Sequence, residues 1–284
     1  PITYHLRMRG VLICGGTGSR LKPLTDITNK SLLPVYDRPL ILYPLNTLLS
    51  AGIRNIAVIT GTEHIDQMTA FLGSGTRFGC ELAYRVQDMP GGIAQALGLA
   101  EDFAQEESIC AILGDNVYFD DLSRSILSFE RGGHIFLKEV PDPERFGVAE
   151  VGTRNQSFET LNGEPGTGNL SVLSLEEKPQ TPKSNYAITG CYLFDKRCFE
   201  VIRNLAPSAR GEMEITDVSR WYLTQGQLTA SLLEKEWIDA GTFESLFLAA
   251  DIVKRSKKTG SIDHVVDRGL RHPCGTGNPL RCGQ

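Results

Sequence analysis

Four charged side chains in this sequence have the chemistry needed to hold phosphate groups and a divalent metal ion. They are Arg20, Lys30, Asp115 and Asp239. An arginine guanidinium offers a planar fork of donors to phosphate oxygens, and a lysine ammonium offers a compact positive charge. Mg²⁺ is usually bound by one or two carboxylates, with phosphate oxygens and water as its other ligands. Surface lysines and turn aspartates are common, so each residue alone is also consistent with an ordinary solvated position.

A glycine-rich segment directly before Arg20 is the strongest local signal. It follows the apolar run 11–14 and consists of Gly15, Gly16, Thr17, Gly18 and Ser19. Glycines let the backbone approach a phosphate chain, and successive amide N–H groups form an anion-binding nest. A dinucleotide fingerprint needs a third glycine where Leu21 stands, and a P-loop needs a Gly-Lys-Ser/Thr triplet that this segment lacks. Taken alone, the segment leaves two interpretations open: a different phosphate-binding turn, and an ordinary strand-to-helix turn.

Three further polar side chains suit the other parts of a nucleotide or sugar substrate. Gln87 both donates and accepts hydrogen bonds, as reading a pyrimidine edge requires. Glu177 can accept from sugar hydroxyls, and Lys178 suits a sugar phosphate. The alternatives are a helix-entry turn at Gln87 and a solvated strand end at the Glu-Lys pair.

The elements that must position these groups alternate along the first half of the chain. Apolar runs predict strands at residues 11–14, 55–60, 82–86 and 108–113, and amphipathic runs predict helices at residues 40–49, 64–72 and 92–103. This β-α-β order predicts an α/β fold with a mostly parallel, Rossmann-like sheet and helices on both faces. Ligands gather at the carboxyl ends of strands in such sheets. The glycine-rich segment and Asp115 both fall at such ends.

The second half predicts a smaller mixed β/α part. Strands are expected at residues 135–140, 146–151, 172–176 and 187–194, and helices at 195–205, 214–224 and 242–254. Residues 152–170 are rich in glycine and polar residues and predict a surface loop. We expect one domain at residues 8–256, with a nucleotide-binding part at about 9–130, a sugar-phosphate-binding part at about 131–242 and a C-terminal helix at about 242–256. Residues 257–284 are expected to form a flexible tail.

Composition excludes several classes of protein. The net charge of −5 argues against nucleic-acid binding, and no apolar run is long enough to cross a membrane. The seven cysteines are scattered without a Cys-x-x-Cys pair, which is typical of buried thiols in a reducing cytoplasm. We therefore expect a cytoplasmic protein that handles small phosphorylated molecules.

Ten motifs occur in one order along the chain. They lie at residues 15–25, 30–35, 85–87, 92–96, 113–116, 146–148, 176–179, 184–187, 208–212 and 239–242. Together they resemble the glucose-1-phosphate thymidylyltransferase family of nucleotidylyltransferases, over about residues 9–254. The segments Ser-Ala-Arg-Gly-Glu (208–212) and Asn-Tyr-Ala (185–187) resemble the thymidylyl branch more than the uridylyl branch. Cys14 stands where alanine is usual, and Arg38 where lysine is usual. The chain resembles the short form of these enzymes, so feedback regulation by dTDP-rhamnose is not expected.

The resemblance implies a role for each matched residue. Catalytic roles fall on Arg20, Lys30, Asp115 and Lys178. The implied nucleotide-binding residues are Gly15, Gly16, Thr17, Gly18, Ser19, Arg20, Lys30, Gln87, Pro90, Gly92 and Asp115. The implied sugar-phosphate-binding residues are Asn116, Gly147, Glu177, Lys178, Ile188 and Tyr192. Asp115 and Asp239 are the implied ligands of Mg²⁺.

The implied reaction is the attack of glucose 1-phosphate on the α-phosphorus of dTTP, which gives dTDP-glucose and pyrophosphate. The attacking phosphate is already ionised at neutral pH, so positioning and charge neutralisation carry the catalysis and no general base is needed. Two alternatives stay open: an enzyme that uses UTP or another hexose 1-phosphate, and a catalytically silent nucleotide-sugar-binding subunit. The substrates are the expected partners, together with a homo-oligomer as a further possibility.

Overall fold

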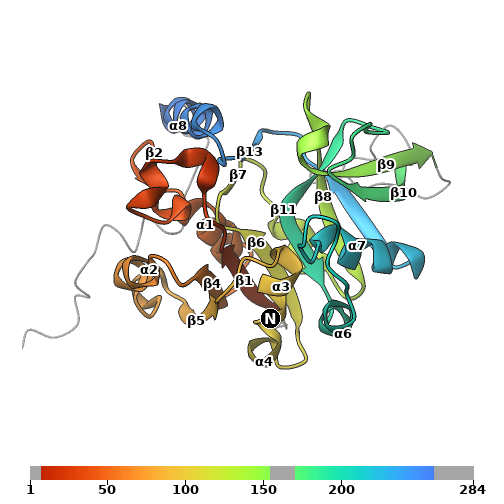
Figure 1. The fold of residues 1–284 in the computed structure, drawn as a ribbon, viewed down its shortest axis with the longest axis horizontal. Coiled ribbons are helices and arrows are strands. Elements are labelled where there is room, and N and C mark those ends of the chain that lie inside the picture. The colour runs from red at the N-terminus through yellow and green to blue at the C-terminus, as the bar shows by residue number, and fades with distance from the viewer. Residues whose placement is uncertain (1–7, 154–169, 259–284) are drawn as a thin grey trace, which may run out of the picture.

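One nine-stranded sheet runs through the computed structural model, which describes residues 8–153 and 170–258 (Figure 1). Its first half is parallel, in the order β6 (Ser108–Leu113), β1 (Met8–Cys14), β4 (Asn55–Gly61) and β5 (Glu81–Gln87). Parallel strands buried on both faces are expected to be continuous apolar runs, and β1 and β4 have that composition. The carboxyl ends of β1, β4, β5 and β6 consequently lie along one edge.

The second half of the sheet is built mainly from antiparallel pairs around one long strand. Strand β11 (Tyr186–Phe194) joins β6 and pairs antiparallel with it. The other strands of this half are β8 (Gly133–Glu139), β9 (Gly147–Thr153), β10 (Leu170–Glu177) and β12 (Leu228–Leu232). Strand β8 pairs with β11, and β9 lies between β10 and β11.

Helices cover both faces of the sheet because alternate residues of each strand point to opposite sides. On one face, Leu12 and Ile56 pack with α1 (Leu42–Ser50), while α2 (Ile65–Leu72) and α5 (Ser123–Ser128) join the same cluster. On the other face, neighbouring strand residues pack with α3 (Ile93–Gly98), α6 (Arg197–Arg203) and α7 (Ile215–Thr224).

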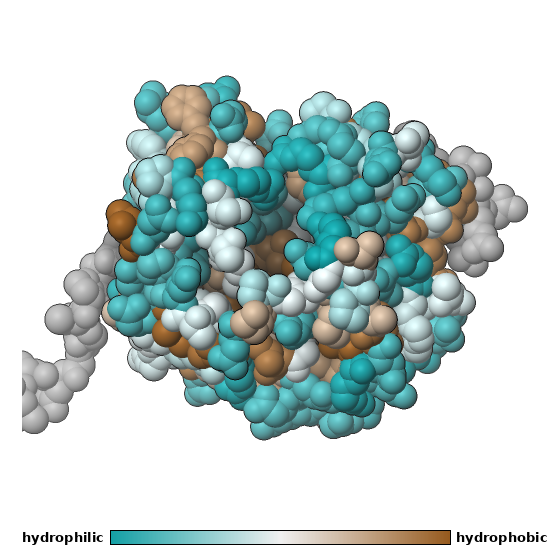
Figure 2. Space-filling view, in the orientation of Figure 1, coloured by the Kyte–Doolittle hydropathy of each residue, from teal (hydrophilic) through white to brown (hydrophobic). Residues whose placement is uncertain are grey.

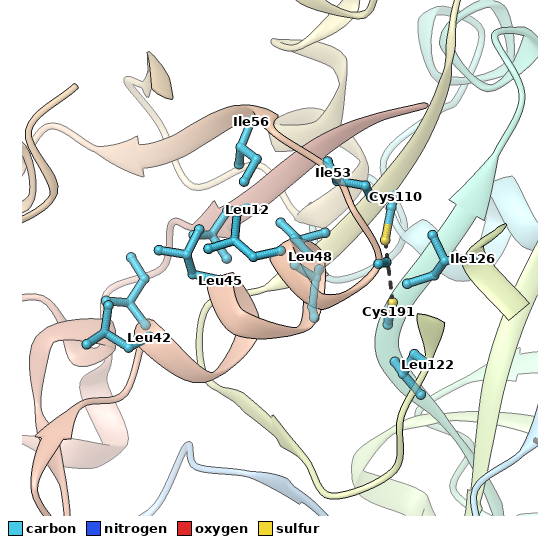
Figure 3. Close-up of a cluster of buried hydrophobic side chains, with 14 of the residues drawn as sticks. Leu12, Leu42, Leu45, Leu48, Ile53, Ile56, Cys110, Leu122, Ile126 and Cys191 are labelled. Carbon is cyan, nitrogen blue, oxygen red and sulfur yellow. Dashed lines mark hydrogen bonds between the residues drawn. The ribbon is translucent and has the colours of Figure 1, made fainter. Parts of the chain in front are cut away.

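The cluster under α1 shows how the apolar pattern becomes a core. Leu45 and Leu48 lie fully buried over Leu12 (Figure 3). Burying one such side chain stabilises the fold by about 1.5–3 kcal/mol. The thiols of Cys110 and Cys191 lie in the same cluster, with their Sγ atoms 3.9 Å apart. All cysteines of the described residues are free and buried, as expected for small core side chains.

Two short ribbons and the last helix complete the described structure. Strands β7 (Asn116–Tyr118) and β13 (Trp237–Asp239) pair antiparallel, and so do β2 (Pro34–Val35) and β3 (Arg38–Pro39). Helix α8 (Phe243–Lys258) packs over β7 and β13 in a third apolar cluster. Within the two described stretches, no helix has the length and apolar character needed to cross a membrane.

The predicted α/β architecture is confirmed, with differences at the level of single elements. The helix predicted at residues 92–103 is divided into α3 and α4 (Glu101–Ala104), because the N–H groups of Leu99 and Ala100 bond to carbonyls three residues back and tighten the turn after Gly98. Strands β2, β3, β7, β12 and β13 and helix α5 were not predicted. Residues 257 and 258, which were predicted to belong to the tail, instead end α8, and Lys257 forms an ion pair with Asp37. Residues 259–284, and most of the loop predicted at 152–170, lie outside the described residues.

Candidate active site

A cavity of about 330 Å³ lies where the parallel strands end and the antiparallel half begins. The space-filling view shows this face of the molecule hollowed between its two parts (Figure 2). Most of the site residues predicted from the sequence line the cavity: Gly15, Gly16, Arg20, Lys30, Gln87, Pro90, Gly92, Asp115, Asn116, Gly147, Glu177, Lys178, Ile188, Tyr192 and Asp239. These residues come from widely separated parts of the chain, so the fold brings them together.

The glycine-rich turn begins where β1 ends at Cys14. Gly16 has φ +105°, and a Cβ atom at Gly15 would lie 2.5 Å from Oε1 of Gln87, so the turn requires glycine at both positions. Thr17 lines an adjoining cavity of about 150 Å³. Gly18 and Ser19, in the same described turn, line neither of these two cavities; the carbonyl of Gly18 accepts from Thr25 Oγ1 at 2.9 Å.

Lys30 is held at the cavity by a capped 3₁₀ turn, Lys30–Leu32. Buried Asn29 precedes the turn; its Oδ1 accepts from the N–H of Ser31 at 2.9 Å, and its Nδ2 donates to the carbonyl of Cys14 at 3.0 Å. These two bonds fix the turn to the end of β1. The lysine side chain is therefore positioned by a neighbour whose importance the sequence did not reveal.

Lys30 and Asp115 form a buried ion pair between Nζ and Oδ2. Burial would lower the pKa of Lys30, but the Asp115 carboxylate outweighs it and holds that pKa above its usual value. Burial likewise tends to raise the pKa of Asp115, and the Lys30 charge overcomes this and keeps it below its usual value. Both groups are therefore charged at neutral pH.

Asp239 is brought beside Asp115 by the pairing of β7 with β13. Asp239 is opposite Asn116 in the ribbon, and the N–H of Ala240 donates to the carbonyl of Asp115 at 2.9 Å. Burial, followed by repulsion from the Asp115 carboxylate, raises the pKa of Asp239 to about 6. Arg20 completes the group: a Cβ atom on Gly241 would lie 2.8 Å from its Nη2 and 3.2 Å from Oδ1 of Asp239.

The donor set at this point fits Mg²⁺. Two carboxylates face one cavity, and hard oxygen ligands of this number are what Mg²⁺ takes when substrate phosphates and water supply the rest. Among residues 8–153 and 170–258, no cluster of three or more histidine, cysteine, aspartate or glutamate side chains is suited to a metal ion. The site therefore lacks the closed ligand sphere of a structural zinc ion.

Asn116 is buried and serves as a support for these groups. Its Nδ2 donates to Oδ1 of Asp115 at 3.0 Å. Its Oδ1 accepts from Nε1 of Trp237 at 2.6 Å and from the N–H of Gly190 at 3.1 Å. Asn116 lines the cavity, and its three hydrogen bonds orient Asp115 and connect β13 to β11.

At the opposite end of the cavity, Glu177 ends β10 beside the start of β9. Its Oε2 accepts from Oγ1 of Thr216 at 2.5 Å, and its Oε1 lies 3.3 Å from Nη2 of Arg210. Burial, then repulsion from Glu214, raises the pKa of Glu177 despite these bonds. A Cβ atom on Gly147 would lie 2.7 Å from the Thr216 hydroxyl, so glycine keeps this end open.

Lys178 follows Glu177 with φ +42°, a left-handed conformation that is uncommon outside glycine. Its backbone N–H is fixed by the carbonyl of Phe146 at 3.0 Å. Such conformations cost about 1–3 kcal/mol and cluster at functional sites. Ile188 and Tyr192 lie on β11 on either side of an irregularity in its pairing with β8, and both line the cavity.

Gln87 ends β5 and lies at the third boundary of the cavity. Its Nε2 donates to Oε1 of Gln95 at 2.7 Å and to the carbonyl of Gly92 at 3.3 Å. Gly92 has φ +100°, and a Cβ atom there would lie 2.5 Å from the carbonyl oxygen of Met213, so only glycine fits.

Among the lining residues that were not predicted as site residues, Arg145, Glu212 and Trp237 have side chains that can donate or accept hydrogen bonds. Arg145 directly precedes the Phe-Gly-Val motif, and its guanidinium lies 5.2 Å over the ring of Phe146. Its position beside that motif was the available signal. Glu212 belongs to the Ser-Ala-Arg-Gly-Glu segment, whereas nothing in the sequence distinguished Trp237.

Comparison with known proteins agrees with this geometry. A model of the nucleotidyl transferase family matches residues 9–256 of the chain. The chain belongs to this family. Among curated proteins, a glucose-1-phosphate thymidylyltransferase of Neisseria meningitidis is 42% identical over 253 residues, covering 87% of this chain and 83% of its own length. The counterpart from Mycobacterium tuberculosis is 42% identical over 252 residues, covering 87% of this chain and 82% of its own length.

Solved structures of nucleotidyl transferases share the fold. A Bacillus anthracis protein assigned as a glucose-1-phosphate thymidylyltransferase, in complex with a sucrose, superposes with a TM-score of 0.78 at 45% identity, covering 87% of this chain and 95% of that one. A UDP-glucose pyrophosphorylase complexed with UDP-glucose has a TM-score of 0.76 at 20% identity, covering 88% and 99% of the two chains. The second likeness concerns the fold alone.

Proposed function

We propose that this nucleotidyl transferase transfers a thymidylyl group from dTTP to glucose 1-phosphate and releases pyrophosphate. The observation that carries the proposal is the grouping of Arg20, Lys30, Asp115 and Asp239 around one cavity. An amide side chain suited to a base lies at one end of that cavity, and Glu177 with Lys178 at another. The relatives with 42–45% identity carry this same activity in their names, which supports the choice of substrates.

Charge neutralisation is the main task of the site, because two phosphate esters that repel each other must meet. Arg20 and Lys30 face the part of the cavity next to the glycine-rich turn, where a triphosphate would meet its backbone N–H groups. Two opposite charges 4 Å apart gain roughly 4 kcal/mol at an effective dielectric constant near 20. The two cations therefore offset much of the repulsion between the esters.

Positioning is the second task. Lys178 binds the phosphate of the sugar substrate, and Glu177, held by Thr216, accepts from its hydroxyls. In this arrangement the ionised sugar phosphate attacks the α-phosphorus without a general base. Asp115 and Asp239 would hold Mg²⁺, which when bound neutralises phosphate charge and aligns the phosphate chain. Lys30, which is paired with Asp115 at the cavity wall, would bind the phosphates from the same side.

The test is pyrophosphate release across a matrix of nucleotides and sugar phosphates with Mg²⁺ present. We expect the highest kcat/KM with dTTP and glucose 1-phosphate, and UTP as the nearest competitor, since a single methyl group distinguishes their bases by only about 1–3 kcal/mol. Asp115→Asn is the matched control and should abolish release while the protein stays folded. Preference for UTP would assign the chain to the uridylyl branch, and no release with any pair would refute the proposal.

A further inference from the structure

Gln95 of α3 contacts the amide of Gln87 but is not among the described residues that line the cavity. Its own Oε1 accepts from the backbone N–H of Gly91 at 3.0 Å and from Nε2 of Gln87 at 2.7 Å. We infer that Gln95 is a positioning residue: it fixes the orientation of the Gln87 amide and thereby selects bases whose ring edge donates a hydrogen bond. The inference deepens the proposed function and rests on it for the identity of the nucleotide.

The orientation of both amides follows from two backbone groups of opposite polarity. A backbone N–H can only donate, so the atom of Gln95 that meets Gly91 must be the oxygen. That oxygen also faces Gln87, which must therefore present its nitrogen. The carbonyl of Gly92 can only accept, and it meets the same Gln87 nitrogen at 3.3 Å. Gln95 and Gly92 therefore require the same orientation of the Gln87 amide. With the amide flipped, Oε1 of Gln87 would face both Oε1 of Gln95 and the carbonyl oxygen of Gly92.

The consequence appears on the other side of the Gln87 amide. Both hydrogens of Nε2 are committed to Gln95 and Gly92, so the amide has only its acceptor oxygen left for a ligand. Within the part of the chain that the structure describes, no hydrogen-bond donor meets this Oε1, which lies against the backbone of Gly15. Gln87 thus acts toward the cavity as an acceptor alone, although a glutamine in general can be either donor or acceptor.

An acceptor-only group distinguishes the pyrimidines by chemistry. Thymine and uracil carry an N–H at ring position 3, which can donate to Oε1 of Gln87. Cytosine has an unprotonated nitrogen there, so two acceptors would face each other in a partly desolvated site. A site that hydrogen-bonds one substrate group rejects an analogue lacking it far more strongly than an apolar pocket rejects a methyl group. The fixed orientation of the Gln87 amide accordingly excludes cytidine nucleotides. Thymine and uracil both satisfy it, so other contacts must distinguish these two bases.

Three variants test whether Gln95 orients the Gln87 amide or has a merely structural role. Gln95→Met keeps the length of the side chain and removes the acceptor at 2.7 Å, so only the longer bond to the carbonyl of Gly92, at 3.3 Å, still opposes a turn of the Gln87 nitrogen toward the base. Gln95→Glu keeps an acceptor for both N–H groups and should restore the wild-type behaviour. Gly91→Ala keeps glutamine at both positions 87 and 95. The new Cβ would lie 2.5 Å from the Gln95 amide group, so that side chain must move. Melting temperatures verify that each variant is folded.

The readout is the ratio of kcat/KM for dTTP to that for dCTP, measured by pyrophosphate release with glucose 1-phosphate. Nucleotide affinities are measured in parallel by calorimetry without any sugar phosphate. We expect this ratio to fall by about tenfold or more in Gln95→Met and Gly91→Ala and to hold in Gln95→Glu, because the unpaired acceptor contact is what rejects cytosine.

Two results would overturn the inference. One is an unchanged ratio in Gln95→Met, with both nucleotides affected equally, as a structural role requires. The other is a wild-type protein that binds dTTP and dCTP with equal affinity. Calorimetry distinguishes this failure from a failure of the proposed function. If the protein binds dTTP more tightly than dCTP, loses this preference in Gln95→Met and releases no pyrophosphate, the transfer reaction is refuted and the role of Gln95 is supported.

Discussion

Replacing Lys30 by methionine removes the positive charge that faces the buried carboxylate of Asp115. Asp239 lies beside it and already has a pKa raised to about 6, in part by repulsion from Asp115. Without Lys30, the metal-free protein must hold two neighbouring carboxylates with Arg20 and Arg145 as nearby cations. We therefore expect Lys30→Met to destabilise the fold as well as to abolish activity.

The size of the effect follows from the burial of the pair. Removing one partner of a buried ion pair costs about 3–5 kcal/mol. The side chain of Lys30 is 19% exposed and that of Asp115 is 7% exposed, so some water reaches the pair and the lower end, about 3 kcal/mol, applies. For a domain of this size about 1 kcal/mol shifts the melting temperature by about 2–4 °C. The expected loss is therefore about 6–12 °C.

Asp115→Asn is the matched control because it removes the other member of the pair. It leaves Lys30 beside Asp239, which still needs a counterion, so its cost should be less than half that of Lys30→Met. The double variant removes both charges and should be more stable than Lys30→Met alone, as a double-mutant cycle would report. Melting temperatures at pH 8 in a chelating buffer measure all four proteins without a metal ion.

Activity alone would not separate these variants, since each should lose at least about 10²-fold in kcat. Stability separates them. Equal losses in Lys30→Met and Asp115→Asn, or a double variant no more stable than Lys30→Met, would refute the view that Lys30 neutralises a carboxylate pair. Addition of Mg²⁺ should restore part of the lost stability in Lys30→Met, because both carboxylates remain to bind it.

Three further predictions concern single positions. Because the pKa of Asp239 is raised to about 6, protons compete with Mg²⁺ for this carboxylate below pH 6, and the metal affinity measured by calorimetry should weaken as pH falls through 6. In the metal-free protein the same carboxyl group binds its proton more tightly in the folded state than in the unfolded state. Its contribution to the free energy of unfolding is therefore lost as pH rises from 3.8 to about 6. Gly147→Ala should raise the KM for glucose 1-phosphate several-fold and leave that for dTTP unchanged in steady-state kinetics, because its Cβ would lie 2.7 Å from the Thr216 hydroxyl. Lys178→Gln should also weaken binding of the sugar phosphate more than that of dTTP, and the reverse pattern would show that the two pockets are exchanged.

The parallel half of the fold was predictable because its signals are local and repeated. Apolar runs predicted β1, β4, β5 and β6, and the carboxyl ends of these strands predicted the position of the cavity. The ribbon of β7 and β13 was not predictable, since each strand has three residues and too few positions to show a period. The proximity of Asp115 and Asp239 depends on that ribbon, and in the sequence it rested on family resemblance rather than on spacing.

Supporting residues were the least predictable part of the site. Gln95 and Thr216 form hydrogen bonds to a residue that lies at the cavity, and Asn29 holds the turn of Lys30 through its bonds to Cys14 and Ser31. Such roles leave no mark in composition or periodicity. Gln95 belongs to the matched motif at residues 92–96, but that motif did not reveal its contacts with Gly91 and Gln87. The inferred role of Gln95 in base selection depends on these contacts.

The ribbon of β7 and β13 also has a consequence for the order in which the protein is made. Trp237 and Asn116, which it joins by a hydrogen bond, are 121 positions apart in the chain. A growing chain therefore has its glycine-rich turn, Lys30 and Asp115 outside the ribosome long before Asp239 is translated. The second carboxylate of the proposed metal site arrives only with β13, so that site cannot be complete before most of the chain has been made.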